Sequence, residues 1–192
     1  MLLLKGHPVK GERIKNNMIF SYSGMDNILK LINEANYAII DIEAIQLQQY
    51  RQFWKGVYSK HHHCLRKVAI LCKNGDYGCE EARPCIKFGK MDDKERKSFD
   101  YNRWRVHRLP FYPSNRRDPT CAQMLQNVRS FLKIKNINLI LHKGGDIERD
   151  LAEKLGYDHI NLELIGVPAA LNHNPLQEVY FYQDCLNKIL RN

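Results

Sequence analysis

The order of apolar and polar positions along the chain predicts a mixed α/β protein. The run from Tyr37 to Ile45 is almost continuously apolar and rich in β-branched residues, which is typical of a strand buried on both faces. Similar runs predict strands over Leu65 to Cys72 and Ile137 to Leu141, with shorter strands around Cys85 to Phe88 and Ile160 to Ile165. Asn74-Gly75 predicts a tight turn after the second strand.

Apolar positions spaced three and four apart predict helices between and after these strands. Thr120 is suited to cap one helix, and Gly156 to end another. The apolar face expected for the last helix comprises Phe181, Tyr182, Cys185, Leu186 and Ile189. The helices are expected over residues 25–35, 91–105, 121–132, 146–155 and 175–190. Three strands followed by alternating helix and strand indicate a mixed sheet with helices on its faces.

The N-terminal residues lack this regular pattern. We expect residues 1–36 to form an arm ending in a short helix, and residues 37–192 to form one α/β domain. No apolar run approaches the roughly 18 residues that span a membrane, and Met1 to Lys5 is too short for a signal peptide. We therefore expect an intracellular protein, in the cytoplasm or nucleus, that does not contact a membrane.

Charge is distributed unevenly along the chain. The net charge is +9, but residues 51–135 alone hold 20 Lys and Arg against 8 Asp and Glu. The first 50 residues are balanced, and residues 136–192 carry a small negative excess. A basic central segment beside an acidic remainder favours a polyanionic partner such as nucleic acid, although solvated surface lysines would give the same composition.

Two carboxylates interrupt the first strand. Asp41 and Glu43 are two positions apart, so both point to the same face of the strand. Carboxylates that share a buried face repel each other and are costly to desolvate, and a divalent cation such as Mg²⁺ or Mn²⁺ removes both costs. The alternative is a strand end that reaches solvent or pairs with Lys or Arg.

A histidine and a glutamate flank the start of the last helix. His173 precedes Glu178 by five positions. A carboxylate at this point could complete a metal site, and a histidine nearby could act as a general base toward a metal-bound water. Taken alone, such a pair is usually a surface feature.

Taken in order, these motifs resemble those of the DEDDh exonucleases, an RNase H-like family. The family's opening DxE matches Asp41 and Glu43, and its closing HxAxxD is approached by His173 to Glu178. Between them, Val106-His107-Arg108-Leu109 resembles a "vHGI" segment, and the strand ending at His142 leads into a further carboxylate. The resemblance implies an RNase H-like mixed sheet flanked by helices.

The resemblance also implies a two-metal site holding Mg²⁺ or Mn²⁺. Asp41, Glu43, Glu148 and Glu178 would be the metal ligands, with Asp146 as the alternative middle carboxylate, and His173 would be the general base. Glutamate stands in place of the family's aspartate at Glu148 and Glu178, Pro175 replaces the small residue of the last motif, and Arg108 replaces a glycine.

Two further groups of residues suggest binding. Arginines that alternate with an aromatic residue favour contacts to phosphates and stacking on a base; they are Arg103, Trp104, Arg105, Arg108, Arg116 and Arg117. The alternative for this segment is a helix end that packs Trp104 and leaves its arginines in solvent. His61-His62-His63-Cys64, with Cys72, Cys79 and Cys85, could supply a Zn²⁺ site, but the spacing fits no standard zinc pattern.

Two functions follow as hypotheses. One is a metal-dependent 3′–5′ exonuclease that hydrolyses single-stranded RNA or DNA. The other is a weakened or inactive RNase H-like module that binds nucleic acid or a protein partner, which the two glutamate replacements favour.

Overall fold

A computed structural model describes residues 22–46, 63–82, 97, 119–144, 146–171 and 173–191. The predicted strand over 85–88 and the predicted helix over 91–105 lie outside these ranges, Lys97 excepted. The elements are α1 (Tyr22–Glu34), β1 (Tyr37–Gln46), β2 (His63–Cys72), β3 (Tyr77–Glu81), α3 (Cys121–Ile134), β4 (Leu139–His142), α4 (Asp146–Leu155), β5 (Asp158–Asn161), the 3₁₀ helix η4 (Leu162–Ile165) and α5 (Pro175–Arg191).

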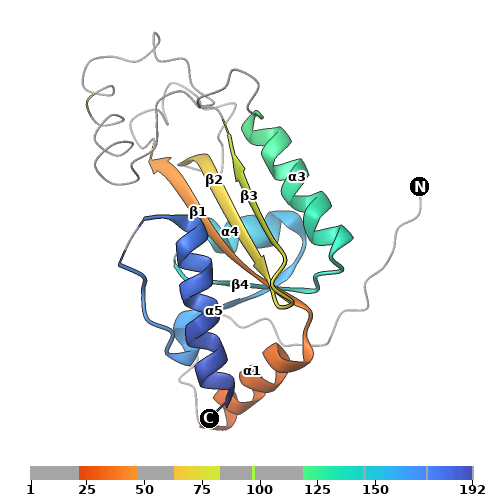
Figure 1. Cartoon of the computed structure of the whole chain (residues 1–192), viewed down its shortest axis with the longest axis vertical. Coiled ribbons are helices and arrows are strands. Elements are labelled where there is room, and N and C mark those ends of the chain that lie inside the picture. The colour runs from red at the N-terminus through yellow and green to blue at the C-terminus, as the bar shows by residue number, and fades with distance from the viewer. Residues whose placement is uncertain are drawn as a thin grey trace.

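The five strands form one mixed sheet in the order β3-β2-β1-β4-β5. β2 pairs antiparallel with β1 and with β3, whereas β4 pairs parallel with β1 and with β5. β1 therefore lies at the centre, between the antiparallel half and the parallel half (Figure 1). The predicted fold class, an α/β mixed sheet with helices on its faces, is confirmed by this topology.

Each face of the sheet is covered by its own helices. Tyr37 and Ile39 of β1 point to the face covered by α1, η4 and α5, where they join one apolar cluster. Ala38 and Ile40, the alternate residues, point to the face covered by α3 and α4 and join a second cluster. In Figure 1, α5 crosses in front of the sheet and α4 lies behind it. The first half of the strand is apolar at every position because both of its faces are buried.

The pairing of β1 with β2 contains one irregularity. Glu43 lies opposite Lys67, but Ala44 lies opposite Leu65, so Arg66 is an extra residue on β2. The Arg66 side chain is fully buried, and its Nε donates a hydrogen bond to the carbonyl oxygen of Ala82, 2.8 Å away. This β-bulge lies directly beside the second carboxylate of β1.

The predicted ends of two helices are found in the structure. Thr120 caps α3: its hydroxyl accepts a hydrogen bond from the backbone N–H of Gln123, whose side chain accepts one from the backbone N–H of Thr120. This reciprocal capping box satisfies two N–H groups that would otherwise have no partner. Gly156 ends α4 with φ of 84°, a left-handed conformation suited to glycine.

Two strands differ from the prediction. β3 follows the turn at Asn74-Gly75 and was not predicted, whereas the segment predicted as the third strand, 85–88, lies outside the described residues. Its sequence, Tyr-Gly-Cys-Glu-Glu, has no apolar alternation because it is a short and partly exposed edge strand. The last strand ends at Asn161; residues 162–165, predicted as part of it, form η4 instead and bury Leu162 and Ile165.

The helix α1 belongs to the same core as the sheet. Its Ile28 and Ile32 are buried in the cluster that contains β1 and α5. The division of the chain at residue 36 stays a prediction. Among the described residues, no helix is both long enough and apolar enough to span a membrane.

Candidate metal centre

The second half of β1 carries the two carboxylates predicted to bind metal. Asp41 and Glu43 are 5% and 3% exposed. They point to the face that α5 covers, as Ile39 does. The pairing of β1 with β4 ends where Ile40 lies opposite His142, so both carboxylates lie beyond the end of the parallel neighbour.

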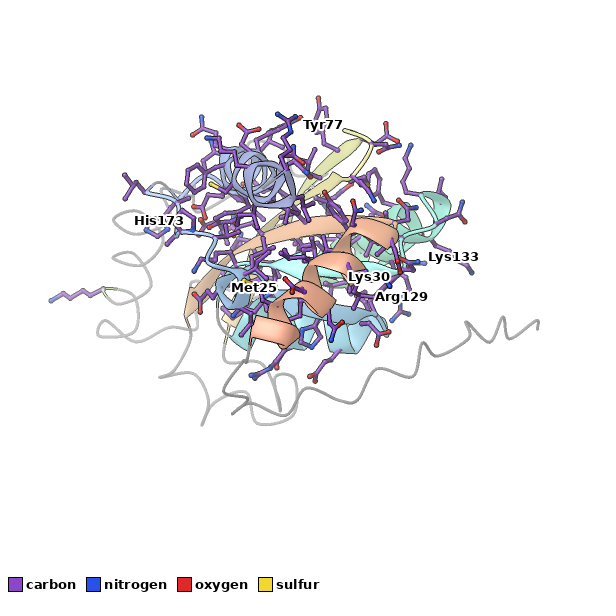
Figure 2. All side chains as sticks on the ribbon, turned by 90° about the horizontal axis from the view of Figure 1, so that it is seen from below. Met25, Lys30, Tyr77, Arg129, Lys133 and His173 are labelled. Atoms are coloured by element: carbon purple, nitrogen blue, oxygen red, sulfur yellow. The ribbon has the colours of Figure 1, made fainter. Side chains whose placement is uncertain are left out.

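α5 brings a third carboxylate to this face. Glu178 lies in the first turn of α5 and is buried. Ligand atoms of Glu43, Glu178 and His173 all lie within 4.8 Å of one another. His173 Nδ1 is 3.8 Å from Glu43 Oε1, and 61% of the His173 side chain is exposed. Figure 2 shows His173 at the margin of the described fold, on the chain that leads into α5.

The fourth carboxylate comes from α4. Glu148 is buried, and its charge is close enough to Asp41 to raise the pKa of that group. Gly144 explains how Glu148 fits: its φ is 138°, and a Cβ at this position would lie 3.2 Å from Glu148 Oε2. Any other residue would be strained at this backbone conformation, and its Cβ would crowd the Glu148 carboxylate. For Asp146, the alternative, the structure describes the backbone that opens α4 but not the side chain.

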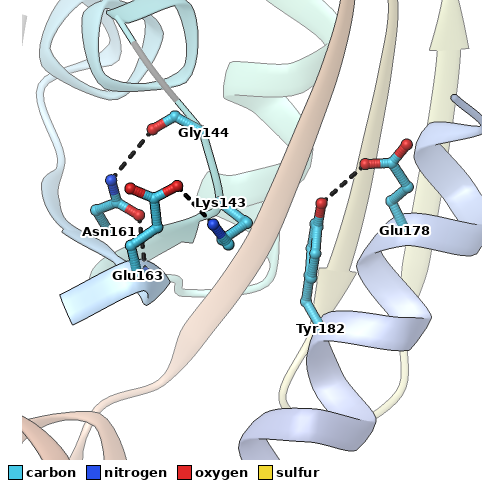
Figure 3. A network of polar contacts seen from close by, with 6 residues as sticks. All are labelled: Lys143, Gly144, Asn161, Glu163, Glu178 and Tyr182. Atoms are coloured by element: carbon cyan, nitrogen blue, oxygen red, sulfur yellow. Dashed lines mark hydrogen bonds and ion pairs between the residues drawn. The ribbon is translucent and has the colours of Figure 1, made fainter. Parts of the chain in front are cut away.

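A polar network holds the turn that contains Gly144. The Asn161 side chain donates a hydrogen bond to the Gly144 carbonyl oxygen, 3.1 Å away, and the Lys143 ammonium pairs with Glu163 (Figure 3). These contacts connect the end of β4 to the end of β5. They fix the backbone on which the Glu148 carboxylate packs.

The electrostatics of this cluster favour a cation. Burial, followed by the charges of Glu178, Glu148 and Glu43, raises the pKa of Asp41 to about 9. Burial also raises the pKa of Glu178. Four oxygen-bearing side chains that oppose one another's ionisation are the donor set that Mg²⁺ and Mn²⁺ prefer, so the residues present fit a divalent metal.

Tyr182 is a member of the site that the sequence interpretation treated only as part of the apolar helix face. Its hydroxyl donates a hydrogen bond to Glu178 Oε2, 2.8 Å away, one turn along α5 (Figure 3). Burial and this hydrogen bond both raise the pKa of Tyr182. The signal in the sequence was the spacing of four residues between Glu178 and Tyr182, which places the two side chains on the same side of a helix.

The other predicted groups lie largely outside the described residues. The residues of the arginine-rich patch lie outside them; they are Arg103, Trp104, Arg105, Arg108, Arg116 and Arg117. His61, His62 and Cys85 of the predicted zinc site lie outside them as well. Cys72 belongs to the cluster under α3 and α4, whereas Cys79 lies opposite Ala69, which faces α5. Cys72 and Cys79 therefore point to opposite faces of the sheet and do not meet at one zinc ion.

The structure is similar to the X-ray structure of the RNase domain of the yeast Pop2 protein. The TM-score is 0.42 and the sequence identity 11%, over 88% of this chain and 79% of that chain. No protein-family model and no curated protein matches the sequence.

Proposed function

We propose that this chain is a metal-dependent 3′–5′ exonuclease that hydrolyses single-stranded RNA or DNA with Mg²⁺ or Mn²⁺. One observation carries the proposal: β1, α4 and α5, which are far apart in the sequence, bring buried carboxylates together beside one exposed histidine. A structural role does not explain this arrangement, because like charges that share a buried site destabilise the fold.

Each residue of the cluster has a role in this proposal. Asp41, Glu43, Glu148 and Glu178 would hold the metal. When bound, a divalent metal activates a water and stabilises the negative charge that develops on phosphate oxygens. His173, with most of its side chain in solvent and Nδ1 3.8 Å from Glu43, would accept a proton from the attacking water.

The substrate class follows from charge and from the resemblance of the motifs. The basic segment from residue 51 to residue 135 suits a phosphate backbone. The arginines and Trp104 of the arginine-rich patch would contact that backbone and its bases. The 3′–5′ direction comes from the resemblance to the DEDDh exonucleases.

The test is cleavage of 5′-labelled single-stranded RNA and DNA with Mg²⁺, Mn²⁺ or EDTA. We expect a ladder that shortens from the 3′ end, requires metal, and is lost in Asp41→Ala. Asp184→Asn is the matched control, because it removes an exposed carboxylate from α5 outside the cluster. Cleavage that persists in Asp41→Ala, or in EDTA, would refute the proposal.

The alternative function, an inactive module that binds nucleic acid, gives a different result in the same samples. It predicts no ladder with either metal but retained binding of the labelled strands by both wild type and Asp41→Ala. The glutamates at 148 and 178, each one methylene longer than the family's aspartate, are the observation in its favour.

A further inference from the structure

The hydroxyl of Tyr182 lies inside the carboxylate cluster. The side chain is 3% exposed, and its O–H donates to Glu178 Oε2 over 2.8 Å. The backbone of Ala170 makes a second hydrogen bond to the same hydroxyl, and the charge of Asp41 acts on it as well. One phenol therefore contacts a carboxylate of α5 and the chain that leads to His173.

The Glu178 side chain needs a hydrogen bond to hold its position more than an aspartate side chain would. Its side chain has one more rotatable bond, and holding a flexible side chain in one conformation costs entropy. A hydrogen bond to one carboxylate oxygen limits the rotation of the group and leaves the other oxygen available to a ligand. Because Tyr182 is four residues further along α5, the helix itself fixes the donor in place.

Tyr182 also contacts the chain that leads into α5. Ala170, whose backbone bonds the Tyr182 hydroxyl, packs against the apolar cluster that contains Tyr182, and His173 follows three residues later.

We infer that Tyr182 is a positioning residue that holds the Glu178 carboxylate in the arrangement that binds metal. The inference rests on the proposed function, because it takes Glu178 to be a metal ligand. Partners that orient metal ligands typically contribute 10- to 100-fold to affinity, so we expect Tyr182→Phe to weaken Mn²⁺ binding by about tenfold.

Tyr37 provides a matched control. It is also fully buried, belongs to the same cluster and has a hydrogen-bonded hydroxyl, but its partner is the Gln183 amide, 2.8 Å away. Tyr37→Phe and Tyr182→Phe each remove one buried hydroxyl near α5. Only the second removes a hydrogen bond to a carboxylate of the cluster.

The experiment measures Mn²⁺ affinity by calorimetry and by electron paramagnetic resonance on the whole chain. We expect about tenfold weaker binding in Tyr182→Phe and unchanged binding in Tyr37→Phe, with thermal unfolding reporting that both fold. If Tyr182→Phe does not fold, Tyr182→Met fills the space without the hydroxyl. The same comparison is then made in a Glu178→Asp background, where the shorter side chain is withdrawn from the hydroxyl and loss of the hydroxyl should change affinity little.

Two unfavourable results can be told apart. If the wild type binds Mn²⁺ and Tyr182→Phe binds it equally well, the inference is wrong while the proposed function stands. Equal losses of affinity in Tyr182→Phe and Tyr37→Phe would also overturn it, because they would show a general effect of core damage. If the wild type binds no Mn²⁺, the proposed function fails and the inference fails with it.

Discussion

The two halves of β1 share one strand and one face of the sheet, but they carry opposite kinds of side chain. Toward the α5 face, the first half presents Tyr37 and Ile39, and the second half presents Asp41 and Glu43. All four side chains are buried to a similar degree. What changes along the strand is the neighbour, because β4 pairs only as far as Ile40.

This difference teaches how a stable strand can carry an unstable charge cluster. The first half has paired strands on both sides and apolar packing above and below, so it anchors the second half. The second half retains its antiparallel pairing with β2, but no described strand pairs with it on the side of β4, and the Glu148 carboxylate of α4 is close enough to raise the pKa of Asp41. Substitutions in the two halves should therefore have separable effects.

Removing a charge from the second half should have the largest effect. Glu43→Gln keeps the shape of the side chain but removes a proposed ligand, and we expect cleavage to fall by about three powers of ten, or about 4 kcal/mol of activation free energy. Single-turnover cleavage at saturating Mn²⁺ measures this. In EDTA the variant should unfold at a higher temperature than the wild type, because one repelling charge is gone. Near-normal cleavage by the variant would show that Glu43 is not required for the reaction.

Creating a cavity in the first half should affect stability alone. Ile39 is fully buried, and Ile39→Ala should lower the free energy of unfolding by about 3 kcal/mol. Urea denaturation measures the loss, with Ile39→Val as a milder control near 1 kcal/mol. Mn²⁺ affinity of the folded variant should stay at the wild-type value. A large change in affinity would show that the two halves are not independent.

The junction between the halves should respond to pH. His142, opposite Ile40, has its pKa lowered to about 4, first by burial and then by the charges of His159 and Arg149, with Glu163 acting in the opposite direction. Between pH 6.5 and 4 the unfolded chain binds a proton that the folded chain does not, so stability falls as pH falls.

We expect the His142 contribution to that loss to be about 3 kcal/mol across this window. Asp41, with its pKa raised to about 9, acts in the opposite direction over the same window, because the folded chain keeps a proton that the unfolded chain releases. The His142 contribution is therefore measured as the difference between wild type and His142→Gln in urea denaturation of metal-free protein at several pH values. An unchanged slope in His142→Gln would mean that other groups control acid stability.

Introducing the aspartate that the DEDDh motif has at the position of Glu178 should have the smallest effect, and it should be unfavourable. Glu178→Asp shortens the side chain, which then no longer reaches the Tyr182 hydroxyl. We expect cleavage to fall by about tenfold rather than rise, because the cluster is built around the longer side chain. The rate of 3′ trimming relative to wild type measures this, and a faster variant would show that the glutamate is a handicap.

The sequence predicted those parts of the fold whose local signal agrees with their environment. β1 was found because burial on both faces makes its first half apolar at every position, and α3 because Thr120 can cap it and its apolar residues share one face. β3 was missed because an edge strand needs no apolar alternation. Residues 162–165 resemble a strand, but Leu162 and Ile165, three apart, are buried together by one 3₁₀ turn.

Some residues of the candidate site could also be predicted from the sequence, and others could not. The spacing of Asp41 and Glu43 predicted a shared face, and the structure shows both buried on it. The choice between Asp146 and Glu148 could not be made from spacing alone, because it depends on the turn at Gly144. Tyr182 was missed because a phenol on a helix next to Phe181 resembles core; in fact Phe181 is 39% exposed and Tyr182 is the buried member of the pair.

The bulge at Arg66 determines which changes of length β2 can accept. In a regular ladder Leu65 would face the same side as Lys67 and the carboxylates of β1, but the extra residue turns it to the face of Val68, where it packs. Deleting Arg66 would leave Leu65 on that face, whereas deleting a residue in the regular part of β2 would exchange the faces of all residues on one side of the gap. Among natural or designed variants, a one-residue deletion in this strand should therefore be tolerated only at position 66.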